Sequence, residues 1–232
     1  MYQIPLEITP RLLYAANSFV VHQGVKDVVE FCDSQILADD YRICVVYAPV
    51  NSGKTHFSVK IADDLQNQGA NLILLDGATL DKFLAGQGLG AEYPQHTVVI
   101  IDNAERYFAN LAPDRSGEFV NLVEALRRSK ASLIVLTSQP VTSFPIDDHV
   151  RSRLRPGEGF CFGSPLDEEM NLLVATLAKQ RGIRLAPKKI SYLAKRLERN
   201  VASIASSLNA LLIKSENGEN LDSYKVLASV VN

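Results

Sequence analysis

An eight-residue string near the start of the chain constrains its fold more than any other feature. Residues 48–55 read Ala-Pro-Val-Asn-Ser-Gly-Lys-Thr and directly follow the apolar run 42–48. The next segment has apolar residues at helical intervals, at Phe57, Ile61 and Leu65. A strand that leads into a loop and then a helix points backbone N–H groups and the positive end of the helix at one spot, where a phosphate can bind. The string matches the pattern GxxxxGK(S/T) at every defined position except the first, and it predicts a phosphate-binding loop (P-loop) in an α/β fold.

Each residue of this loop has an expected role. Lys54 would reach the β- and γ-phosphates of a nucleotide, and Thr55 would bind Mg²⁺. The residues expected to hold ATP or ADP are Pro49, Val50, Asn51, Ser52, Gly53, Lys54 and Thr55. Ala48 replaces the first glycine of the pattern, and a left-handed backbone at this position would cost about 1 kcal/mol or more, which would weaken binding. The alternative interpretation is an ordinary strand-to-helix turn.

Five short apolar runs are typical of buried parallel strands. They cover residues 42–48, 71–76, 97–102, 132–138 and 159–163. The segments between them have helical spacing and can serve as crossover helices on the faces of a sheet. We therefore expect an α/β core with a five-stranded parallel sheet flanked by helices.

Strand patterns end at about residue 166, and helical spacing continues to the end of the chain. Helices are predicted at about 166–181, 187–198, 200–215 and 221–231. The length of 232 residues suits one core and one small lid. The expected organisation is a tail at 1–12, an α/β core at 13–165 and a helical lid at 166–232.

The third apolar run ends in Asp102, in the form of a Walker B segment. A carboxylate at the carboxyl end of such a strand can hold Mg²⁺ beside the P-loop. ATPases of this kind have a second carboxylate at the next position, where this chain has the neutral Asn103. The general base is therefore in question. Glu105 is one substitute, although its position is also typical of a solvated helix start.

Composition argues against several other classes of protein. The chain is 47% hydrophobic with a formal charge of −2, which indicates neither disorder nor a surface made for polyanions. The cysteines Cys32, Cys44 and Cys161 lack metal-ligand spacing, and we expect them to be buried small side chains in a reducing cytoplasm. No run is long and apolar enough to cross a bilayer, and the first residues do not resemble a secretory signal.

The order of these motifs resembles the DnaA family of AAA+ proteins, and especially its shortened Hda branch. The matching segments are 18–21, 52–56, 98–102, 118–126, 136–140, 152–154, 182–185, 192–197 and 200–201. The resemblance implies a P-loop AAA+ core with a helical lid. It also implies that Phe19, Val20 and Val21 lie beside adenine, and that Ser138, or Thr137 before it, is a sensor near the γ-phosphate.

The resemblance further implies an arginine finger, which reaches from one subunit to the γ-phosphate held by its neighbour. Arg153 in Ser152-Arg153-Leu154 is the candidate, and Arg151 is the second choice. Without the family match, the cluster of Arg151, Arg153 and Arg155 would be interpreted as a solvated basic helix end.

The lid departs from the family at its second sensor. The family has an arginine just after its Asn-Val pair, and this chain has Ala202. Arg199 lies about one turn earlier and is a weak substitute. We therefore expect lid closure on a γ-phosphate to be weakened.

The two ends of the chain carry further expectations. DnaA has a C-terminal helix-turn-helix domain, and the chain ends at Asn232 without room for one, so sequence-specific duplex binding is not expected. Gln3, Ile4, Leu6 and Ile8 resemble the tail by which Hda docks on the polymerase III sliding clamp. The alternative is a tail that packs on its own domain.

These features together predict a nucleotide-binding regulator that acts on DnaA. ADP or ATP with Mg²⁺ would position Arg153, and the protein, tethered to the DNA-loaded clamp, would stimulate hydrolysis of DnaA-bound ATP. Self-association into a homo-oligomer stays open. Two other classes stay open. An ATPase of the helicase-loader kind would turn over its own nucleotide, and a non-catalytic adaptor would not need Lys54.

Overall fold

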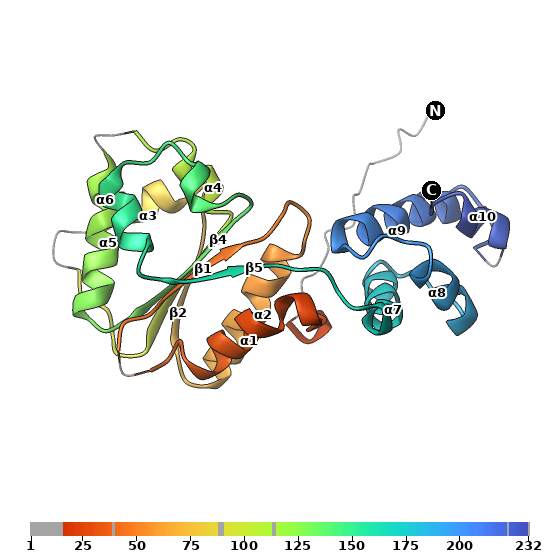
Figure 1. Ribbon diagram of the computed structural model, residues 1–232, viewed down its shortest axis with the longest axis horizontal. Coiled ribbons are helices and arrows are strands. Elements are labelled where there is room, and N and C mark those ends of the chain that lie inside the picture. The colour runs from red at the N-terminus through yellow and green to blue at the C-terminus, as the bar shows by residue number, and fades with distance from the viewer. Residues whose placement is uncertain (1–15, 39, 88–90, 113–114, 222, 232) are drawn as a thin grey trace, which may run out of the picture.

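A parallel five-stranded sheet forms the centre of the larger part of the molecule (Figure 1). The computed structural model describes residues 16–38, 40–87, 91–112, 115–221 and 223–231. The strands are β1 (Ile43–Tyr47), β2 (Asn71–Asp76), β3 (Thr97–Asp102), β4 (Ser132–Thr137) and β5 (Glu158–Cys161), in the order β2-β3-β4-β1-β5. The four pairings in this sheet are all parallel. Every strand therefore ends at the same edge of the sheet, which is where ligands bind in open α/β folds.

Alternate residues of the central strands face two separate apolar clusters. Cys44 and Ile100 pack with α1 (Gln23–Ser34) and α2 (Lys54–Asn67) on one face. Ile43 and Val99 pack on the other face. The helices of that second face are α3 (Leu80–Gly86), α5 (Ser116–Arg128) and α6 (Asp148–Leu154), with the short α4 (Glu105–Phe108) at the carboxyl edge. β3 and β4 are buried at every position because both of their faces are covered, as expected for a parallel sheet.

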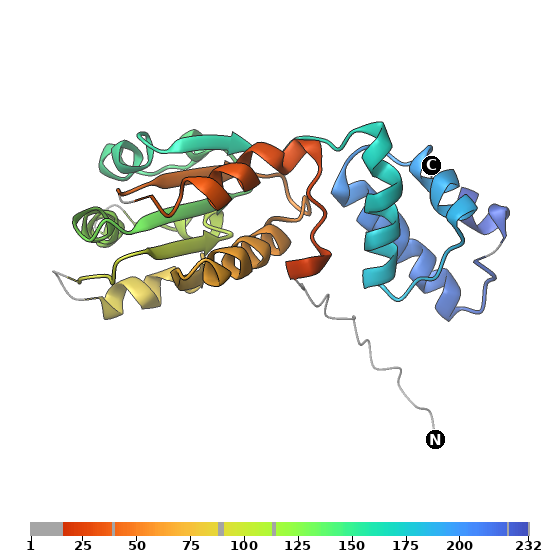
Figure 2. The same ribbon diagram turned by 90° about the horizontal axis from the view of Figure 1, so that it is seen from below.

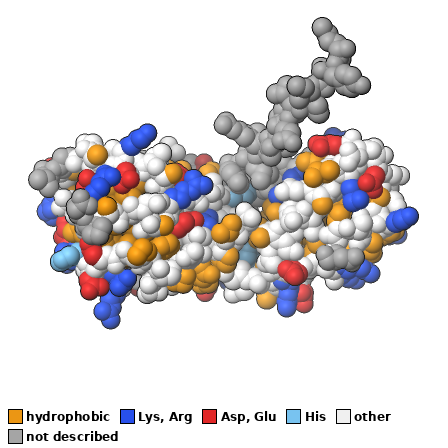
Figure 3. Space-filling view, turned by 90° about the horizontal axis from the view of Figure 1, so that it is seen from above, with side chains coloured by type: hydrophobic (Ala, Val, Ile, Leu, Met, Phe, Trp, Pro, Cys, Tyr) orange, Lys and Arg blue, Asp and Glu red, His pale blue; other side chains and the backbone are white. Residues whose placement is uncertain are grey.

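The last quarter of the chain is a helical lid with a core of its own. It contains the 3-10 turn η4 (Asp167–Glu169), followed by α7 (Met170–Gln180), α8 (Pro187–Ala194), α9 (Val201–Glu216) and α10 (Tyr224–Ala228). Their apolar faces meet in one cluster around residues such as Val174, Leu193 and Leu208. In Figure 2 the lid lies beyond the carboxyl edge of the sheet, and Figure 3 shows a waist between the two parts.

The segment before α1 joins the core to the lid. It begins with the 3-10 turn η1 (Ala16–Ser18), whose Ser18 carbonyl accepts a hydrogen bond of 2.9 Å from the Gln180 side chain of α7. Val20 packs on the lid cluster, whereas Phe19 packs on the core. The backbone N–H of Gln23 donates to Glu169 at 2.8 Å. The first residues described thus contact both parts.

The expected fold class is confirmed. Each predicted strand is present within one or two residues, and Pro187 begins α8 as its type favours. One prediction on the cysteines is wrong: Cys32 and Cys44 are buried, but Cys161 is exposed, because β5 is an edge strand. Across the residues that the structure describes, every helix is too short or too polar to traverse a bilayer.

Candidate functional site

The P-loop connects the end of β1 to the start of α2 at the carboxyl edge of the sheet. Two of its residues have left-handed backbones, Asn51 with φ 61° and Gly53 with φ 97°. No atom lies within 4 Å of the position that a side chain on Gly53 would take, so the need for glycine there comes from its φ alone. Gly53 is the N-cap of α2, and it has no side chain that could accept from the first N–H groups of the helix. These N–H groups stay available to a phosphate.

The expected strain at Ala48 is not present. Its backbone is not left-handed, and its N–H donates to the Thr137 carbonyl at 2.9 Å, which extends the β1–β4 pairing by one residue. Ala48 is completely buried. The loop therefore tolerates alanine at the first position of the pattern, and the prediction of weakened binding at this residue loses its physical basis.

Lys54 is already positioned for a phosphate. Its side chain is only 7% exposed, and Nζ donates to the Ala48 carbonyl at 3.2 Å. The Glu105 carboxylate lies 3.8 Å from the same Nζ. An ammonium group this buried needs compensating oxygens, and phosphate oxygens would add to them.

Asp102 and Thr55 meet beside the loop. Asp102 is the last residue of β3, and its buried carboxylate accepts a hydrogen bond from the Thr55 side chain. Burial raises the pKa of Asp102, although the bonds from Thr55 and from the Asn103 backbone and the charge of Lys54 act in the opposite direction. A hydroxyl and a carboxylate next to a phosphate loop are the oxygen donors that Mg²⁺ prefers. The residues present therefore fit the predicted metal.

Asn103 is held in a left-handed conformation with φ 51°, which asparagine tolerates better than most residues. Its amide donates to Asp76 at 2.9 Å and to Asp102 at 3.3 Å. The side chain thus bridges two carboxylates at the ends of neighbouring strands. A carboxylate at this position would repel both, so the neutral residue suits its local surroundings.

Glu105 is not at a solvated helix start. Its side chain is 22% exposed, and one oxygen accepts a hydrogen bond of 3.1 Å from the backbone N–H of Ser138. The other oxygen faces Lys54. The predicted sensor Ser138 therefore lies next to the phosphate end of the site through Glu105, while the buried Thr137 hydroxyl donates to the Gln139 carbonyl at 2.7 Å.

A cavity of about 550 Å³ lies between the P-loop and the lid. Its core wall contains Val50, Asn51, Gly53, Lys54, Thr55, His56, Asn103, Glu105 and Arg106. Its lid wall contains Leu177, Gln180, Arg181, Val201, Ala202, Ala205, Ser206 and Asn209. Five of the seven predicted loop residues line this cavity, and Pro49 and Ser52 do not.

The lid wall contains an arginine that the sequence patterns did not single out. Arg181 follows α7 and faces the cavity, with Nε donating to the Asn209 side chain at 2.7 Å and Nη1 donating to the Leu177 carbonyl at 3.0 Å. Ala202 does line the cavity, where the family has its sensor arginine. Arg199, the weak substitute, does not line the cavity and pairs with Asp167 at 3.4 Å.

The residues expected beside adenine are divided between different surroundings. Phe19 contacts the ring of His56, a residue of the cavity wall, edge-on at 5.3 Å between ring centroids. Val20 packs on the lid, and Val21 is 44% exposed. None of the three lines the cavity itself. Phe19 only contacts His56, which is part of the cavity wall.

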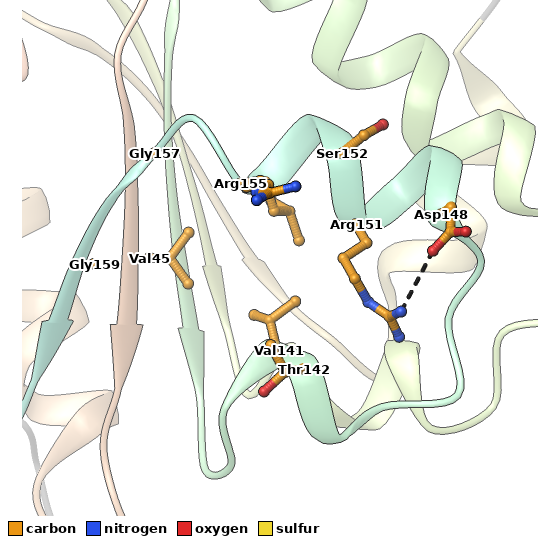
Figure 4. Close-up of a pocket in the computed structure, with 10 residues that line it drawn as sticks. Val45, Val141, Thr142, Asp148, Arg151, Ser152, Arg155, Gly157 and Gly159 are labelled. Carbon is orange, nitrogen blue, oxygen red and sulfur yellow. Dashed lines mark hydrogen bonds and ion pairs between the residues drawn. The ribbon is translucent and has the colours of Figure 1, made fainter.

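The arginine cluster lies on α6, at another place in the molecule. Arg153 Nε is 2.5 Å from the Glu124 carboxylate of α5 in an ion pair, and its side chain is 38% exposed. Arg151 pairs with Asp148 at 3.4 Å (Figure 4). Arg155 is exposed and has no ion-pair partner among the described residues. Arg151 and Arg155 line a second cavity, of about 690 Å³, whose floor includes Val45 of β1 and Gly159 of β5 (Figure 4).

The predicted clamp-binding residues Gln3, Ile4, Leu6 and Ile8 lie outside the described residues. Their role stays a prediction.

Comparison with models of known protein families finds no match. The chromosomal replication initiator DnaA of Chlorobaculum tepidum is 25% identical over 194 residues, which cover 78% of this chain and 38% of that protein. Domain III of Thermotoga maritima DnaA has a TM-score of 0.72 at 16% identity and covers 94% of this chain and 95% of that chain. AMPPCP-bound DnaA from Aquifex aeolicus has a TM-score of 0.63 at 15% identity, covering 91% and 68%. The chain has a DnaA-like AAA+ fold.

In this DnaA-like fold, the P-loop and the lid line one cavity, and the buried Asp102 lies behind its lining residue Thr55. This chain spans less than two-fifths of the length of the Chlorobaculum DnaA. The Aquifex structure contains the bound nucleotide analogue AMPPCP.

Proposed function

We propose that this DnaA-like protein is a nucleotide-binding regulator of replication initiation, of the Hda kind. In this proposal it acts on a DnaA molecule that carries ATP, together with the DNA-loaded polymerase III sliding clamp. One observation carries the proposal. The groups that would hold phosphate and Mg²⁺ are complete, whereas groups that serve hydrolysis are replaced, and arginines lie on a separate surface.

The cavity supports the first half of this proposal. Lys54 and Thr55 offer a cation and a hydroxyl at one end, next to the first N–H groups of α2, and the Asp102 carboxylate bonds to Thr55 behind them. The neutral Asn103 and the small Ala202 stand where a water-orienting carboxylate and a lid arginine would act. Nucleotide would thus be a long-lived ligand, held mainly by the P-loop side of the cavity, that sets the position of Arg153.

The surface of α6 supports the second half. Arg153 carries the family's finger position and pairs with Glu124 within the same chain. An exposed or half-exposed ion pair contributes little stability, so a γ-phosphate of a neighbouring DnaA could replace Glu124 as its partner. The guanidinium would then neutralise charge that develops in the transition state.

The test is the rate of ATP hydrolysis by DnaA with DNA-loaded clamp, measured with the wild-type protein or with one of three variants. Arg153→Ala should abolish the stimulation, because a finger contributes roughly 10³-fold or more. Arg128→Ala, at an exposed arginine on α5, is the matched control and should leave it intact. Arg155→Ala tests the arginine directly after α6, which is exposed and has no ion-pair partner among the described residues. No stimulation by the wild type would rule out the regulator proposal, and loss with Arg155→Ala alone would move the finger to that residue.

A second candidate function is favoured by the surroundings of Glu105. This carboxylate lies 3.8 Å from Lys54, close enough to the phosphate end to orient a water. If the isolated protein hydrolyses ATP, and Glu105→Gln removes that turnover while nucleotide still binds, the helicase-loader kind of ATPase becomes the better description.

A further inference from the structure

The sheet has an open edge at β5. Within the described ranges of the chain, β1 is the only strand that pairs with β5, so β5 forms one end of the sheet. Its residues Glu158, Gly159 and Cys161 are exposed, and Phe160 is half-buried. An edge strand presents a row of backbone N–H and C=O groups that can pair with another extended chain. β5 therefore offers a template on which one further strand can form.

The cavity of about 690 Å³ at α6 lies beside this edge. Gly157 and Gly159 border it on the strand side, and α6 and the 3-10 turn η3 (Val141–Ser143) border it on the other side (Figure 4). Phe160 packs on the α1 side of the sheet, so the alternation of a strand places Gly159 and Cys161 on the opposite face. No atom lies within 4 Å of the position that a side chain on Gly159 would take. A side chain from an added strand therefore has room over Gly159.

The walls of the cavity combine apolar and basic side chains. The apolar ones come from β1, η3 and α6 and are Val45, Val141 and Leu154. Arg155 is exposed and forms no ion pair in the part of the chain that the structure describes, whereas Arg151 pairs with Asp148. Two cations and one carboxylate give these walls a net positive charge, which suits a single acidic side chain better than a polyanion.

We propose that β5 and this cavity bind an extended peptide segment of another protein, in which an acidic residue lies two positions from an apolar one. The segment would add a strand to the open edge of β5 and hydrogen-bond to its backbone. Because alternate side chains of a strand share a face, the apolar side chain would lie over Gly159 and the acidic one would reach Arg155. Strand addition of this kind takes affinity from main-chain bonds and specificity from pockets for alternate side chains.

The open edge favours a peptide over a small organic acid. A small acid can fill the cavity and pair with Arg155, but it leaves the outward N–H and C=O groups of β5 to solvent. An extended segment satisfies both sets of groups at once. The cavity shares no lining residue with the nucleotide cavity, so a peptide can bind whether or not a nucleotide is held at the P-loop.

Cys161 provides a chemical handle for the test. Cys32 and Cys44 are buried, so Cys161 is the exposed thiol of the chain. The whole protein is mixed with the peptide acetyl-Thr-Glu-Thr-Val-Thr-Cys-amide, supplied as its mixed disulfide with 2-mercaptoethanol. Thiol–disulfide exchange transfers the peptide to Cys161 and releases 2-mercaptoethanol, and intact mass gives the labelled fraction. When the peptide cysteine lies beside Cys161, alternation places its valine over Gly159 and its glutamate toward Arg155.

The glutamate peptide should label Cys161 at about one tenth of the concentration that a matched lysine peptide needs, because a hydrogen bond between charged groups contributes enough free energy for that ratio. Arg155→Glu should reverse this preference. Arg128→Glu makes the same change at an exposed arginine of α5 and should preserve it. Gly159→Leu should lower labelling by the glutamate peptide about tenfold, relative to labelling by N-acetylcysteine amide, because it fills the space for the valine. A peptide with proline in place of its threonines should label no better than the lysine peptide, since proline cannot continue a strand.

Each other outcome overturns the proposal. Equal labelling by the glutamate and lysine peptides would show that Arg155 does not select an acid. Equal labelling by the glutamate and proline peptides would mean that no strand forms and would assign the cavity to a small acid. A dimer of the wild type that Arg155→Glu dissociates, seen by sedimentation, would assign the edge to a second copy of this chain. Lys54→Ala should leave peptide labelling unchanged, so this test is independent of the regulator function proposed above.

Discussion

The two walls of the nucleotide cavity are built very differently. On the core wall, buried or half-buried polar groups are bonded to one another: Lys54 to Ala48, Thr55 to Asp102, and Asn103 to Asp76. The lid wall is made mostly of small or apolar side chains from α7 and α9. Its charge resides in Arg181.

This difference separates holding a nucleotide from responding to it. A wall that is ordered in advance loses little conformational entropy when a ligand binds. A wall with few ligand-directed groups gives the lid little free energy to distinguish ATP from ADP. The core should therefore determine affinity, and the lid should determine the smaller difference between nucleotides.

The largest expected effect tests the core wall. Lys54→Ala should lower affinity for Mg·ATP by about 10- to 100-fold, because it removes charge-assisted bonds to phosphate. Titration of a fluorescent ATP analogue measures this. Lys60→Ala is the control, since Lys60 is on the same helix and pairs with Asp64 away from the cavity. Equal affinities for both variants would mean that the core wall does not hold the phosphates.

The second prediction tests the lid wall. Arg181→Ala should lower affinity for ATP by about tenfold or less and that for ADP by a smaller factor, because the guanidinium would contact the outer phosphates across the cavity. Competition titrations with both nucleotides give the ratio. Arg199→Ala is the control, because Arg199 pairs with Asp167 outside the cavity. A larger effect from Arg199→Ala would invert the assignment of the two arginines.

The contrast between the walls also explains which features could be predicted from sequence. The sheet and P-loop depend on short continuous strings, so apolar runs and the Ser-Gly-Lys-Thr string were enough to locate them. Arg181 is 19 residues before the Asn-Val-Ala segment at 200–202, and only the packing of α7 against α9 brings the two together. The position of Glu105 against Lys54 likewise depends on how α4 follows β3.

Backbone conformation was equally hidden. The sequence does not determine the φ angle of Ala48. Strain was expected there because the P-loop pattern has glycine at this position, but the backbone of Ala48 is not left-handed. The exposure of Cys161 followed from the place of β5 at the edge of the sheet. Strand order is a long-range property that a single apolar run does not encode.

The third prediction concerns the junction that sets the distance between the walls. Gln180→Ala removes the side-chain bond from α7 to the Ser18 carbonyl and should cost about 0.5–1.5 kcal/mol locally. The free energy of local opening, measured by hydrogen exchange, should fall in residues 16–23 and in α7 and not in β3. Gln66→Ala, at an exposed glutamine of α2, is the control. Equal loss of protection in β3 would show that core and lid open as one unit.

The smallest effect is a dependence on pH at the same junction. His22 is the N-cap of α1, where its Nδ1 accepts a hydrogen bond of 3.2 Å from the Gly24 N–H, an interaction that requires the neutral ring. Burial lowers the pKa of His22, although the charge of Glu169 opposes this shift. The unfolded chain therefore binds the proton more readily than the folded one, and the stability from this group is present above pH about 6.5.

This contribution should be lost as the pH falls from about 6.5 through the lowered pKa of the folded protein. His22→Asn keeps a cap acceptor that does not titrate, so it should reduce the decline in melting temperature between about pH 6.5 and 5. His149→Asn is the control, because His149 lies on α6, far along the chain from the junction. If the melting temperatures of His22→Asn and the wild type decline equally over this pH range, protonation of His22 does not destabilise the junction. The pH dependence would then belong to groups within the core or the lid alone.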